Sequence, residues 1–337
     1  MTKPLHIALW GCGNMGNSLA QALVATGEAK LSIVHDLSPE AASTFSERYE
    51  ARVAPSAEAL LAHPGLDGVI VALPPYLHAM AVCQAAEARV DVFCEKPMAP
   101  RVADCHEMLA AVERAGIKLM IGQVLRYYEP YRTIRRWTEE GRFGKLYSAS
   151  IWRVVNGARW ETIPGYWRAN RAQSGGYLLE VGAHELDMLR CLMGRPETVY
   201  ATEQKVLPYA HEMEDHILVQ VRFAEGGSAV YEGGGGSSVS RYGFRFYFEG
   251  ATLISESAFD ASKLQIYDRE GNELDALRDE FTTQHPVQAA LRDWLAALRD
   301  EAPIPIPGEE GLATVALAQA AYTSAETGKL ISCDTRS

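Results

Sequence analysis

The stretch HIALWGCGNMGNSLAQALVATGE, residues 6–28, decides the fold of the first part of the chain. An apolar run at 7–10 leads into a glycine-rich turn, and apolar residues at helical spacing follow it. Gly11 permits the tight turn, Gly13 allows a diphosphate to approach the backbone, and Gly16 allows the helix to pack closely on the strand. The start of the helix adds unpaired N–H groups and a partial positive charge. The stretch therefore predicts a strand, a turn and a helix that bind a dinucleotide.

A second strand, KLSIVHD at residues 30–36, ends in an acidic residue about 20 positions after the glycine turn. In this position Asp36 would accept hydrogen bonds from the adenosine ribose hydroxyls. No arginine lies between Ile33 and Glu47 to bind a 2′-phosphate, so the pattern favours NAD over NADP. A βαβ unit with an incidental acid is the alternative interpretation. Two further residues of the turn are predicted to contact the cofactor, Asn14 and Met15.

Short apolar runs continue to alternate with helix patterns as far as Gly122. This alternation predicts an α/β fold with a doubly wound parallel sheet, a Rossmann domain at residues 1–122 and a second domain at 123–337. Ligands of such sheets bind beyond the carboxyl ends of the strands. Five residues at or just after predicted strand ends are therefore expected to contact the cofactor: Leu73, Pro74, His78, Glu95 and Lys96. For Lys96, a solvated surface charge is the alternative.

The composition sets limits on location and partners. A chain of 337 residues exceeds what one hydrophobic core usually organises, so two domains are expected. The formal net charge of −11 argues against a nucleic-acid or anionic-membrane partner. The start MTKPLHIALWGCG has no signal pattern and the chain has no long apolar span, so we expect a cytoplasmic protein. The six scattered cysteines form no C-x-x-C pair and are interpreted as small buried hydrophobes.

The stretch GGYLLEVGAHELDMLRCLMG, residues 175–194, places ionisable residues among apolar ones. If it forms one helix, spacings of four and three put Glu180, His184 and Asp187 on one stripe. Such groups need partners, a ligand or a catalytic role, because burying them unpaired is costly. A satisfied core histidine is the alternative for His184. Metal ligation is a further alternative, but no other His or Cys cluster completes a coordination set, so no metal is expected.

The second domain is predicted to hold half-buried strands and a substrate-binding loop. The run HILVQVRF at 216–223 alternates apolar and polar positions, as a half-buried strand does. A crossover helix is expected at 126–141. The Gly/Ser-rich run at 232–243 is expected to be a flexible connection, with a mobile flap as the alternative. The loop at 154–176 is dense in aromatic and arginine side chains, which stack on sugar rings and bind hydroxyl or carboxylate oxygens. Aromatic packing under a long loop is the alternative for these side chains. The residues expected to contact substrate are Arg126, Tyr127, Trp160, Trp167, Arg168 and Asp187.

Five ordered motifs resemble those of the Gfo/Idh/MocA family, which is named for glucose-fructose oxidoreductase, inositol dehydrogenase and a rhizopine catabolism protein. They are the Gly11/Gly13/Gly16 turn, ALPPYLH, FCEKPMA, LRYYEPYRTIRRWTEEGRFGKLYSA and the stretch with EVGAHELD. The resemblance extends over essentially the whole chain, to GEEGLATVALAQAAYTSAETGKLI near the C-terminus. It implies a Rossmann domain followed by an α+β domain with a large, mostly antiparallel open sheet. It also implies a homodimer or homotetramer in which these sheets pair.

The same resemblance assigns roles to individual residues. It places the lysine of the family's E-K-P motif at Lys96, the active-site histidine at His184 and the acid four residues before it at Glu180. Asp187 matches the second acid of the H-x-x-D pattern, and the bond from Lys96 to the following proline is a candidate for the cis isomer. Two positions depart from the family's pattern: Glu180 replaces the commoner aspartate, and Pro75 stands where many members have asparagine.

Members of the family transfer a hydride between a nicotinamide cofactor and a hydroxyl or carbonyl carbon of sugars, cyclic polyols or their derivatives. The resemblance therefore implies a dehydrogenase or reductase acting on CH–OH groups, with Lys96, His184 and Glu180 as catalytic residues. A histidine, with a reference pKa of about 6.5, is the natural proton acceptor at neutral pH. The alternatives are a reductase of another small carbonyl or a dihydrodiol, and a non-catalytic dinucleotide-binding regulator of the same fold.

Overall fold

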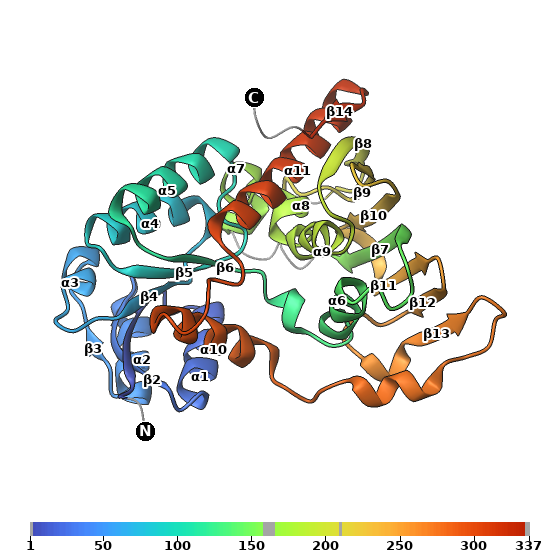
Figure 1. Cartoon of the computed structure of the whole chain (residues 1–337). Helices are drawn as coiled ribbons and strands as arrows, with labels where there is room; N and C mark the ends of the chain where they lie inside the picture. Colours follow the sequence, from blue (N-terminus) through green and yellow to red (C-terminus); the bar gives the residue numbers. More distant parts are fainter. Residues whose placement is uncertain (1–2, 158–165, 209–210, 334–337) are drawn as a thin grey trace. The chain divides into compact units, whose positions relative to one another are not determined.

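The computed structural model describes residues 3–157, 166–208 and 211–333. The chain divides into two compact units, Met1–Val124 with Gln284–Leu312, and Leu125–Thr283 with Ala313–Ser337 (Figure 1). The sequence pattern assigns residues 284–312 to the second domain, whereas in the structure this segment packs in the first unit. The reason is an apolar helix in the segment, which covers part of the first unit's sheet.

The first unit is built on a six-stranded sheet with the order β3-β2-β1-β4-β5-β6, in which all paired neighbours are parallel. This confirms the predicted doubly wound parallel sheet, whose strand order reverses between β1 and β4, the point where such sheets bind ligands. The strands are β1 (Leu5–Trp10), β2 (Ala29–His35), β3 (Arg52–Val53), β4 (Gly68–Val71), β5 (Asp91–Glu95) and β6 (Leu119–Gly122). The helices are α1 (Asn14–Ala25), α2 (Pro39–Tyr49), α3 (Ala57–Leu61), η1 (Pro75–Leu77), α4 (His78–Glu87), α5 (Val102–Ala115) and α10 (Pro286–Leu298).

Helices cover both faces of the parallel sheet. Helices α4 and α5 pack together on one face, and α1 and α10 pack together on the other (Figure 1). Trp294 of α10 is fully buried, and its ring meets that of Phe93 edge-on at 5.7 Å between centroids. A Cβ on Gly68 would lie 2.9 Å from the Trp294 ring, so this glycine gives the indole room. Loss of the indole would destabilise the unit by about 3–5 kcal/mol, which explains why this late segment belongs to the first unit.

The second unit contains an eight-stranded sheet with the order β13-β12-β11-β7-β10-β9-β8-β14. All its paired neighbours are antiparallel except β7 and β10, which confirms the mostly antiparallel sheet. The strands are β7 (Leu146–Asn156), β8 (Pro196–Gln204), β9 (His216–Phe223), β10 (Ser228–Gly234), β11 (Gly236–Phe248), β12 (Ala251–Ser255), β13 (Gln265–Asp268) and β14 (Ile331–Ser332). The helices are η2 (Val124–Tyr127), α6 (Tyr131–Glu139), η4 (Trp167–Ala169), α7 (Arg171–Ser174), α8 (Tyr177–Glu180), α9 (Ala183–Met193), η5 (Ala261–Lys263), η6 (Asp275–Glu280) and α11 (Gly308–Thr327), within which the division between units falls.

The alternation predicted for residues 216–223 is confirmed in β9. Ile217, Val219 and Val221 are fully buried, whereas Leu218 between them is 40% exposed. Helices α8 and α9 pack on β10, and α9 also packs on β7, so they cover the apolar face of the sheet. The other face carries Leu218 and Val230, which are each about 40% exposed in the described structure. The predicted crossover helix is shorter than expected and begins at Tyr131, after a proline that lacks a backbone N–H.

The Gly/Ser-rich run at 232–243 is strand rather than a flexible connection, so that expectation is wrong. It forms the end of β10 and the start of β11, which pairs with β7 from Gly236 onward with a register shift before Arg241. Gly234 has φ +147°, and a Cβ there would lie 2.2 Å from the carbonyl oxygen of Asp215. These glycines therefore permit a close approach between backbone segments.

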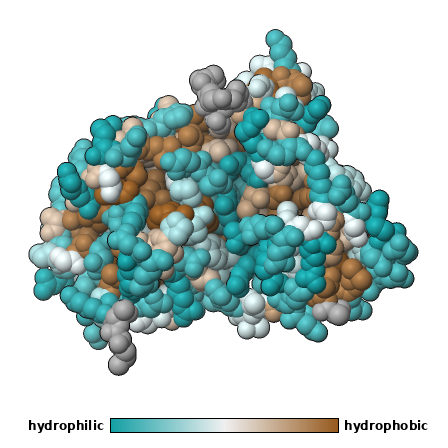
Figure 2. All heavy atoms as spheres, viewed as in Figure 1, coloured by the Kyte–Doolittle hydropathy of each residue, from teal (hydrophilic) through white to brown (hydrophobic). Residues whose placement is uncertain are grey.

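The face shown in Figure 2 is mostly hydrophilic, and the cysteines are buried or half-buried. Hydrophilic residues make up most of the surface visible in Figure 2, with hydrophobic patches between them. No helix in the described ranges is long and apolar enough to cross a membrane. Three of the free cysteines are buried, Cys12, Cys94 and Cys105, and the other three are half-buried.

Candidate functional site

The turn after β1 has a geometry that requires glycine. Gly11 has φ +105°, and a Cβ there would lie 2.5 Å from the carbonyl oxygen of Ala72. A Cβ on Gly16 would lie 2.1 Å from the carbonyl oxygen of Gly11, so only glycine lets α1 begin so close to β1. Apart from Gly13 itself and its neighbours along the chain, no atom of the described residues comes within 4 Å of a Cβ placed on Gly13, so the backbone there is open to a ligand.

The start of α1 suits an anionic group. Gly13 is the N-cap residue of this 12-residue helix, and its N–H groups receive no side-chain cap in the described part of the chain. Asn14 and Met15, the next two residues, are exposed. Burial raises the pKa of the Cys12 thiol to about 12, and the nearby carboxylate of Asp36 adds to the shift. The thiol is therefore neutral at pH 7, and the turn fits a diphosphate held by backbone N–H groups and the helix dipole.

Asp36 links this turn to the end of β2. Its Oδ2 accepts a hydrogen bond from the backbone N–H of Cys12 at 2.7 Å, and its Oδ1 accepts one from the N–H of Ser38 at 2.8 Å. Each carboxylate oxygen keeps a second acceptor site, so the anchored carboxylate can still bind a pair of hydroxyl groups. The side chain is half-buried beside the glycine turn, as a ribose contact requires.

His78 supports the segments that follow β4 and β5. The ring is fully buried, with Nε2 2.8 Å from the carbonyl oxygen of Leu73 and Nδ1 2.9 Å from that of Pro97. Both partners are acceptors, so a neutral ring donates to one of them and a protonated ring to both. The side chain, expected to contact the cofactor, thus directs both ring nitrogens to protein carbonyls and ties the two segments together.

Lys96 stands at the carboxyl edge of the parallel sheet, after β5. The Lys96–Pro97 peptide bond is cis, which confirms that expectation. The side chain of Lys96 is half-buried, and its backbone N–H donates to Glu95 Oε2 at 3.1 Å. Glu95 is buried, and a Cβ on Gly122 would lie 3.2 Å from its carboxylate, so the carboxylate packs against the end of β6. Leu73 and Pro74 are half-buried after the end of β4.

In the second unit, the stretch 175–194 forms two helices rather than one. Helix α8 ends at Glu180 and α9 begins at Ala183, so the expectation of a single polar stripe is wrong. Glu180 lies on α8, whereas His184 and Asp187 lie on α9. The chain bends at Gly182, where a Cβ would lie 2.8 Å from the hydroxyl of a buried tyrosine on β10. A pattern of apolar residues along the chain does not reveal that contact.

Glu180 binds an arginine of the predicted substrate loop. Its carboxylate is buried and accepts a hydrogen bond from Arg168 Nε. Arg168 also donates to the hydroxyl of Tyr166, and its guanidinium lies over the ring of Trp167 at 4.6 Å. His184, the second residue of α9, is half-buried. Trp160, also predicted to contact substrate, lies outside the described residues.

Asp187 and Arg126, both expected to contact substrate, bind each other. The Nε and Nη2 atoms of Arg126 donate to the two carboxylate oxygens of Asp187, each at 2.7 Å. The Asp187 side chain is 0% exposed and that of Arg126 is 8% exposed. Thr314 donates to the same carboxylate at 3.3 Å. The pair therefore holds η2, α9 and α11 together in the interior, while Tyr127 in the same turn is half-buried.

Sequence reasoning missed an ion pair beneath the break between α8 and α9. Arg153 of β7 donates through Nη1 to Glu185 Oε1 at 3.0 Å and to the carbonyl oxygen of Val181 at 3.2 Å. Glu185 is fully buried. The available signal was a further carboxylate next to His184 in an apolar stretch, which, by the cost of burying a charge, required a partner.

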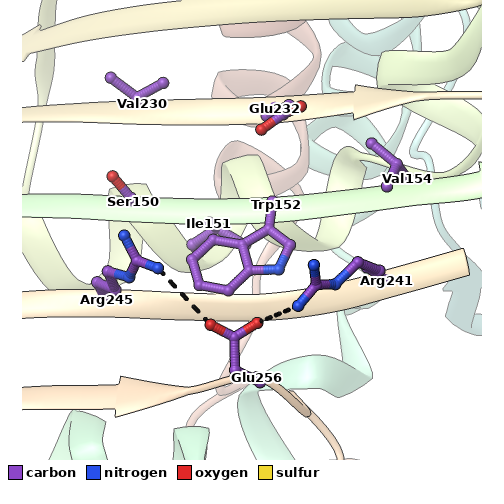
Figure 3. Close-up of a pocket in the computed structure, with 9 residues that line it drawn as sticks. All are labelled: Ser150, Ile151, Trp152, Val154, Val230, Glu232, Arg241, Arg245 and Glu256. Carbon is purple, nitrogen blue, oxygen red and sulfur yellow. Dashed lines mark hydrogen bonds and ion pairs between the residues drawn. The ribbon is translucent and has the colours of Figure 1, made fainter. Parts of the chain in front are cut away.

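A hollow of about 410 Å³ lies on strands β7, β10 and β11 and is bordered by Glu256, which directly follows β12 (Figure 3). Glu256 lies between two arginines there, 2.9 Å from Arg241 and 3.6 Å from Arg245, and the Arg245 guanidinium lies over the Trp152 ring. None of the residues predicted for the site lines this hollow. Within the described ranges, no group of three or more His, Cys, Asp or Glu side chains is arranged to hold a metal ion.

The parallel sheet, the glycine turn and the anchored Asp36 define a dinucleotide-binding Rossmann protein with an additional α+β unit. Residues 5–123 match the family model described as the oxidoreductase family with an NAD-binding Rossmann fold. Residues 131–254 match the model of the GFO/IDH/MocA C-terminal domain. The chain belongs to the Gfo/Idh/MocA family of oxidoreductases.

Relatives with named activities and solved structures agree with this assignment. The chain is 34% identical over 240 residues to 2,7-anhydro-N-acetylneuraminate hydratase of Mediterraneibacter gnavus, over 69% of this chain but only 62% of that protein's length. It is 29% identical over 342 residues to inositol 2-dehydrogenase of Rhizobium meliloti, which covers 97% of this chain and 99% of the relative. The crystal structure of the WlbA dehydrogenase from Chromobacterium violaceum, in complex with NADH and UDP-GlcNAcA, is 26% identical with a TM-score of 0.88, covering 98% of this chain and 96% of that one.

Proposed function

We propose that the protein is an NAD-dependent dehydrogenase or reductase that acts on a hydroxyl or carbonyl carbon of a sugar, a cyclic polyol or a derivative. The observation that carries the proposal is the cradle formed by the glycine turn and Asp36, with open backbone at Gly13 and an uncapped helix start. Membership of an NAD-binding oxidoreductase family supports a dinucleotide as its occupant. The inositol and WlbA dehydrogenase relatives support the substrate class.

In the proposed complex, the backbone of Gly11 and Gly13 and the start of α1 hold the diphosphate, and Asp36 holds the adenosine ribose. The lack of arginine between Ile33 and Glu47 supports NAD over NADP. When bound, the nicotinamide supplies or accepts the hydride. His78 contributes by holding the segments after β4 and β5 in place.

The chain itself must move a proton to or from the reacting oxygen. His184, half-buried at the start of α9, is the proposed proton acceptor. The ammonium of Lys96 is proposed to hydrogen-bond the same oxygen and to stabilise alkoxide character as it develops. Lys96 belongs to the first unit and His184 to the second.

The substrate contacts are proposed to come from the segment around η4. Trp167 and Arg168 are half-buried, and their rings and N–H groups suit the C–H faces and hydroxyl groups of a carbohydrate. Glu180, predicted to be catalytic, is proposed to act by holding Arg168, since its carboxylate accepts from that guanidinium. Asp187 is not part of the proposed substrate site, because it is fully buried and bound to Arg126.

A substrate panel tests the proposed class. Purified protein is mixed with NAD or NADH and with inositols, aldoses, their keto forms, a UDP-sugar acid and 2,7-anhydro-N-acetylneuraminate. The last compound is included because of the hydratase relative. Nicotinamide absorbance reports net hydride transfer, and NMR of the products reports conversion without it. Tight NAD binding with no conversion of any panel member would favour a dinucleotide-binding regulator.

Substitution of the proposed acid–base residues tests their roles. His184→Ala and Lys96→Ala are each expected to lower kcat by about 10² to 10⁴ while NAD affinity is largely kept. His106→Ala and Lys30→Ala, at exposed positions, serve as matched controls and should leave both quantities unchanged. Wild-type turnover in the first two variants would contradict the assigned roles.

Substitution of Asp36 tests the cofactor. Asp36→Ala should weaken NAD binding more than NADP binding, because the variant loses the ribose contact while a 2′-phosphate no longer meets a carboxylate. Calorimetric titration with each cofactor measures the difference. An equal loss for both would indicate that Asp36 acts only by anchoring Cys12 and Ser38.

We also propose that the open face of the eight-stranded sheet pairs with a second copy of the chain. Large apolar side chains stand exposed on its strands, among them Tyr200, Leu218 and Val230 at about 40% each. Light scattering should give a dimer or tetramer for the wild type and a smaller species for Leu218→Arg with Val230→Glu. A monomeric wild type at micromolar concentration would rule this pairing out.

A further inference from the structure

We propose that Arg153 and Glu185 form a positioning pair that sets the joint between α8 and α9, and through it the directions of Glu180 and His184. The joint consists of Val181 and the glycine that follows it. The inference rests on the proposed function, because it concerns the two residues that flank this joint.

The guanidinium of Arg153 spans the joint through one nitrogen. Its Nη1 donates to the carbonyl oxygen of Val181 at 3.2 Å and to Glu185 Oε1 at 3.0 Å. Val181 directly follows Glu180, and Glu185 directly follows His184. The two acceptors of one donor nitrogen therefore lie next to the two functional residues along the chain, so the guanidinium limits how far the ends of α8 and α9 rotate against each other.

The backbone that carries Arg153 is fixed in the middle of the sheet. Position 153 pairs with Gly233 of β10 on one side and with Tyr242 of β11 on the other. The carbonyl oxygen of Arg153 accepts a hydrogen bond from the hydroxyl of Tyr177, the first residue of α8, at 2.6 Å. Its guanidinium lies over the Tyr242 ring at 5.0 Å. One residue of β7 therefore contacts the start of α8, the joint and the first turn of α9.

The joint lies closely against the sheet at Gly182. A Cβ on Gly182 would lie 2.8 Å from the Tyr231 hydroxyl and 3.1 Å from the Leu178 carbonyl oxygen. Tyr231 is fully buried on β10, so it is not free to move aside. The contact with Tyr231 sets how closely the joint approaches the sheet, and the contacts with Arg153 set its direction.

Stability alone does not account for this pair. Glu185 is fully buried and the Arg153 side chain is 24% exposed, and apolar residues can often replace such a buried pair without loss of stability. Apolar side chains do not supply a directional bond to the Val181 carbonyl. The pair is therefore explained by the orientation it gives to the chain between Glu180 and His184.

The double variant Arg153→Met with Glu185→Leu separates orientation from stability. It leaves no unpaired buried charge, so it should fold with a Tm close to that of the wild type. NAD affinity should be unchanged, whereas kcat should fall by about 10-fold to 10²-fold, because a displaced proton acceptor meets the substrate poorly. The kcat limb of the pH profile that depends on His184 should also shift. Glu185→Gln keeps an acceptor oxygen for Arg153 and should retain near-wild-type kcat.

A pair elsewhere in the same unit provides the matched control. Arg142 Nη1 donates to Glu280 Oε1 at 2.6 Å, and the other polar partners of Glu280, Arg136 and Trp137, lie on α6. Arg142→Met with Glu280→Leu removes a more exposed Arg–Glu pair of the same unit, together with the bonds that Glu280 accepts from Arg136 and Trp137. Its kcat and pH profile should match those of the wild type.

Hydrogen exchange separates failure of this inference from failure of the proposed function. Amides of residues 177–186 should exchange faster in the double variant than in the wild type, whether or not a substrate has been found. Unchanged exchange, or unchanged kcat and pH profile, would overturn the inference. A wild type inactive on the whole panel would defeat the proposed function, while the exchange data would still decide whether the pair orders the joint. If the double variant does not fold, Arg153→Lys is measured in its place, because a lysine ammonium keeps the charge but does not bridge Val181 and Glu185. The inference predicts a lower kcat and faster exchange of residues 177–186 in this variant, and wild-type values would overturn it.

Discussion

Replacing Asp187 with leucine should destabilise the second unit strongly. The carboxylate accepts two hydrogen bonds from Arg126 at 2.7 Å, and the two side chains are 0% and 8% exposed. Its removal leaves the Arg126 guanidinium buried without its partner, a change that costs about 3–5 kcal/mol. For a unit of this size each kcal/mol lowers Tm by about 2–4 °C, so the expected loss is about 6–20 °C.

Thermal unfolding followed by calorimetry measures this effect. The control is Arg222→Met, which removes an exposed pair with Glu197 at 3.1 Å whose side chains are 73% and 48% exposed. That substitution should cost at most about 1 kcal/mol, because water screens exposed ion pairs. The double variant Arg126→Met with Asp187→Leu should recover part of the lost stability, since it removes the Arg126 charge together with its carboxylate. The contact of Arg190 with Asp187, at 3.7 Å, is lost in both variants.

The same variants distinguish an interior support from a substrate contact. If Asp187 bound substrate, Asp187→Leu would raise the KM for the substrate and leave Tm unchanged. A wild-type Tm with a raised KM would therefore refute the structural role of the pair.

Three further substitutions test separate features. Gly16→Ala should raise the Kd for NAD by at least about 10-fold, because its Cβ would lie 2.1 Å from the Gly11 carbonyl oxygen. An unchanged Kd in calorimetric titration would contradict the proposal that this turn binds NAD. Burial raises the pKa of Glu214 above its usual range. The stability of the wild type therefore falls as the pH rises from the unfolded-state pKa towards the folded-state pKa of this group, and Glu214→Gln should raise Tm more at pH 8 than at pH 4. Equal gains in Tm at the two pH values would contradict this pH dependence. His78→Ala should cost about 1–3 kcal/mol and weaken NAD binding, and stability equal to the wild type would show that the two carbonyl contacts contribute nothing.

The sequence by itself determined the glycine turn and the position of Asp36, the cofactor-binding half of the proposed site. Gly11, Gly13, Gly16 and Asp36 lie in a turn and at the end of an adjacent strand, so their spacing along the chain reflects their spacing in the fold. The alternation in β9 likewise follows from a period of two imposed by the strand itself. Family motifs added the lysine after β5 and its cis bond, which the structure confirms.

Only the tertiary structure decided how the acidic residues of 175–194 are used. The bend at Gly182 lies close to a tyrosine of a distant strand, and the arginine that binds Asp187 lies 61 positions earlier in the chain. The periodicity of apolar residues predicts which side chains of one helix or strand are buried. It does not predict which distant side chain contacts each of them. Two predictions were revised for this reason: Asp187 as a substrate ligand and the glycine run at 232–243 as a flexible connection. In both cases the neighbours in space set the free energy, of a buried charge in the first and of a close backbone contact in the second.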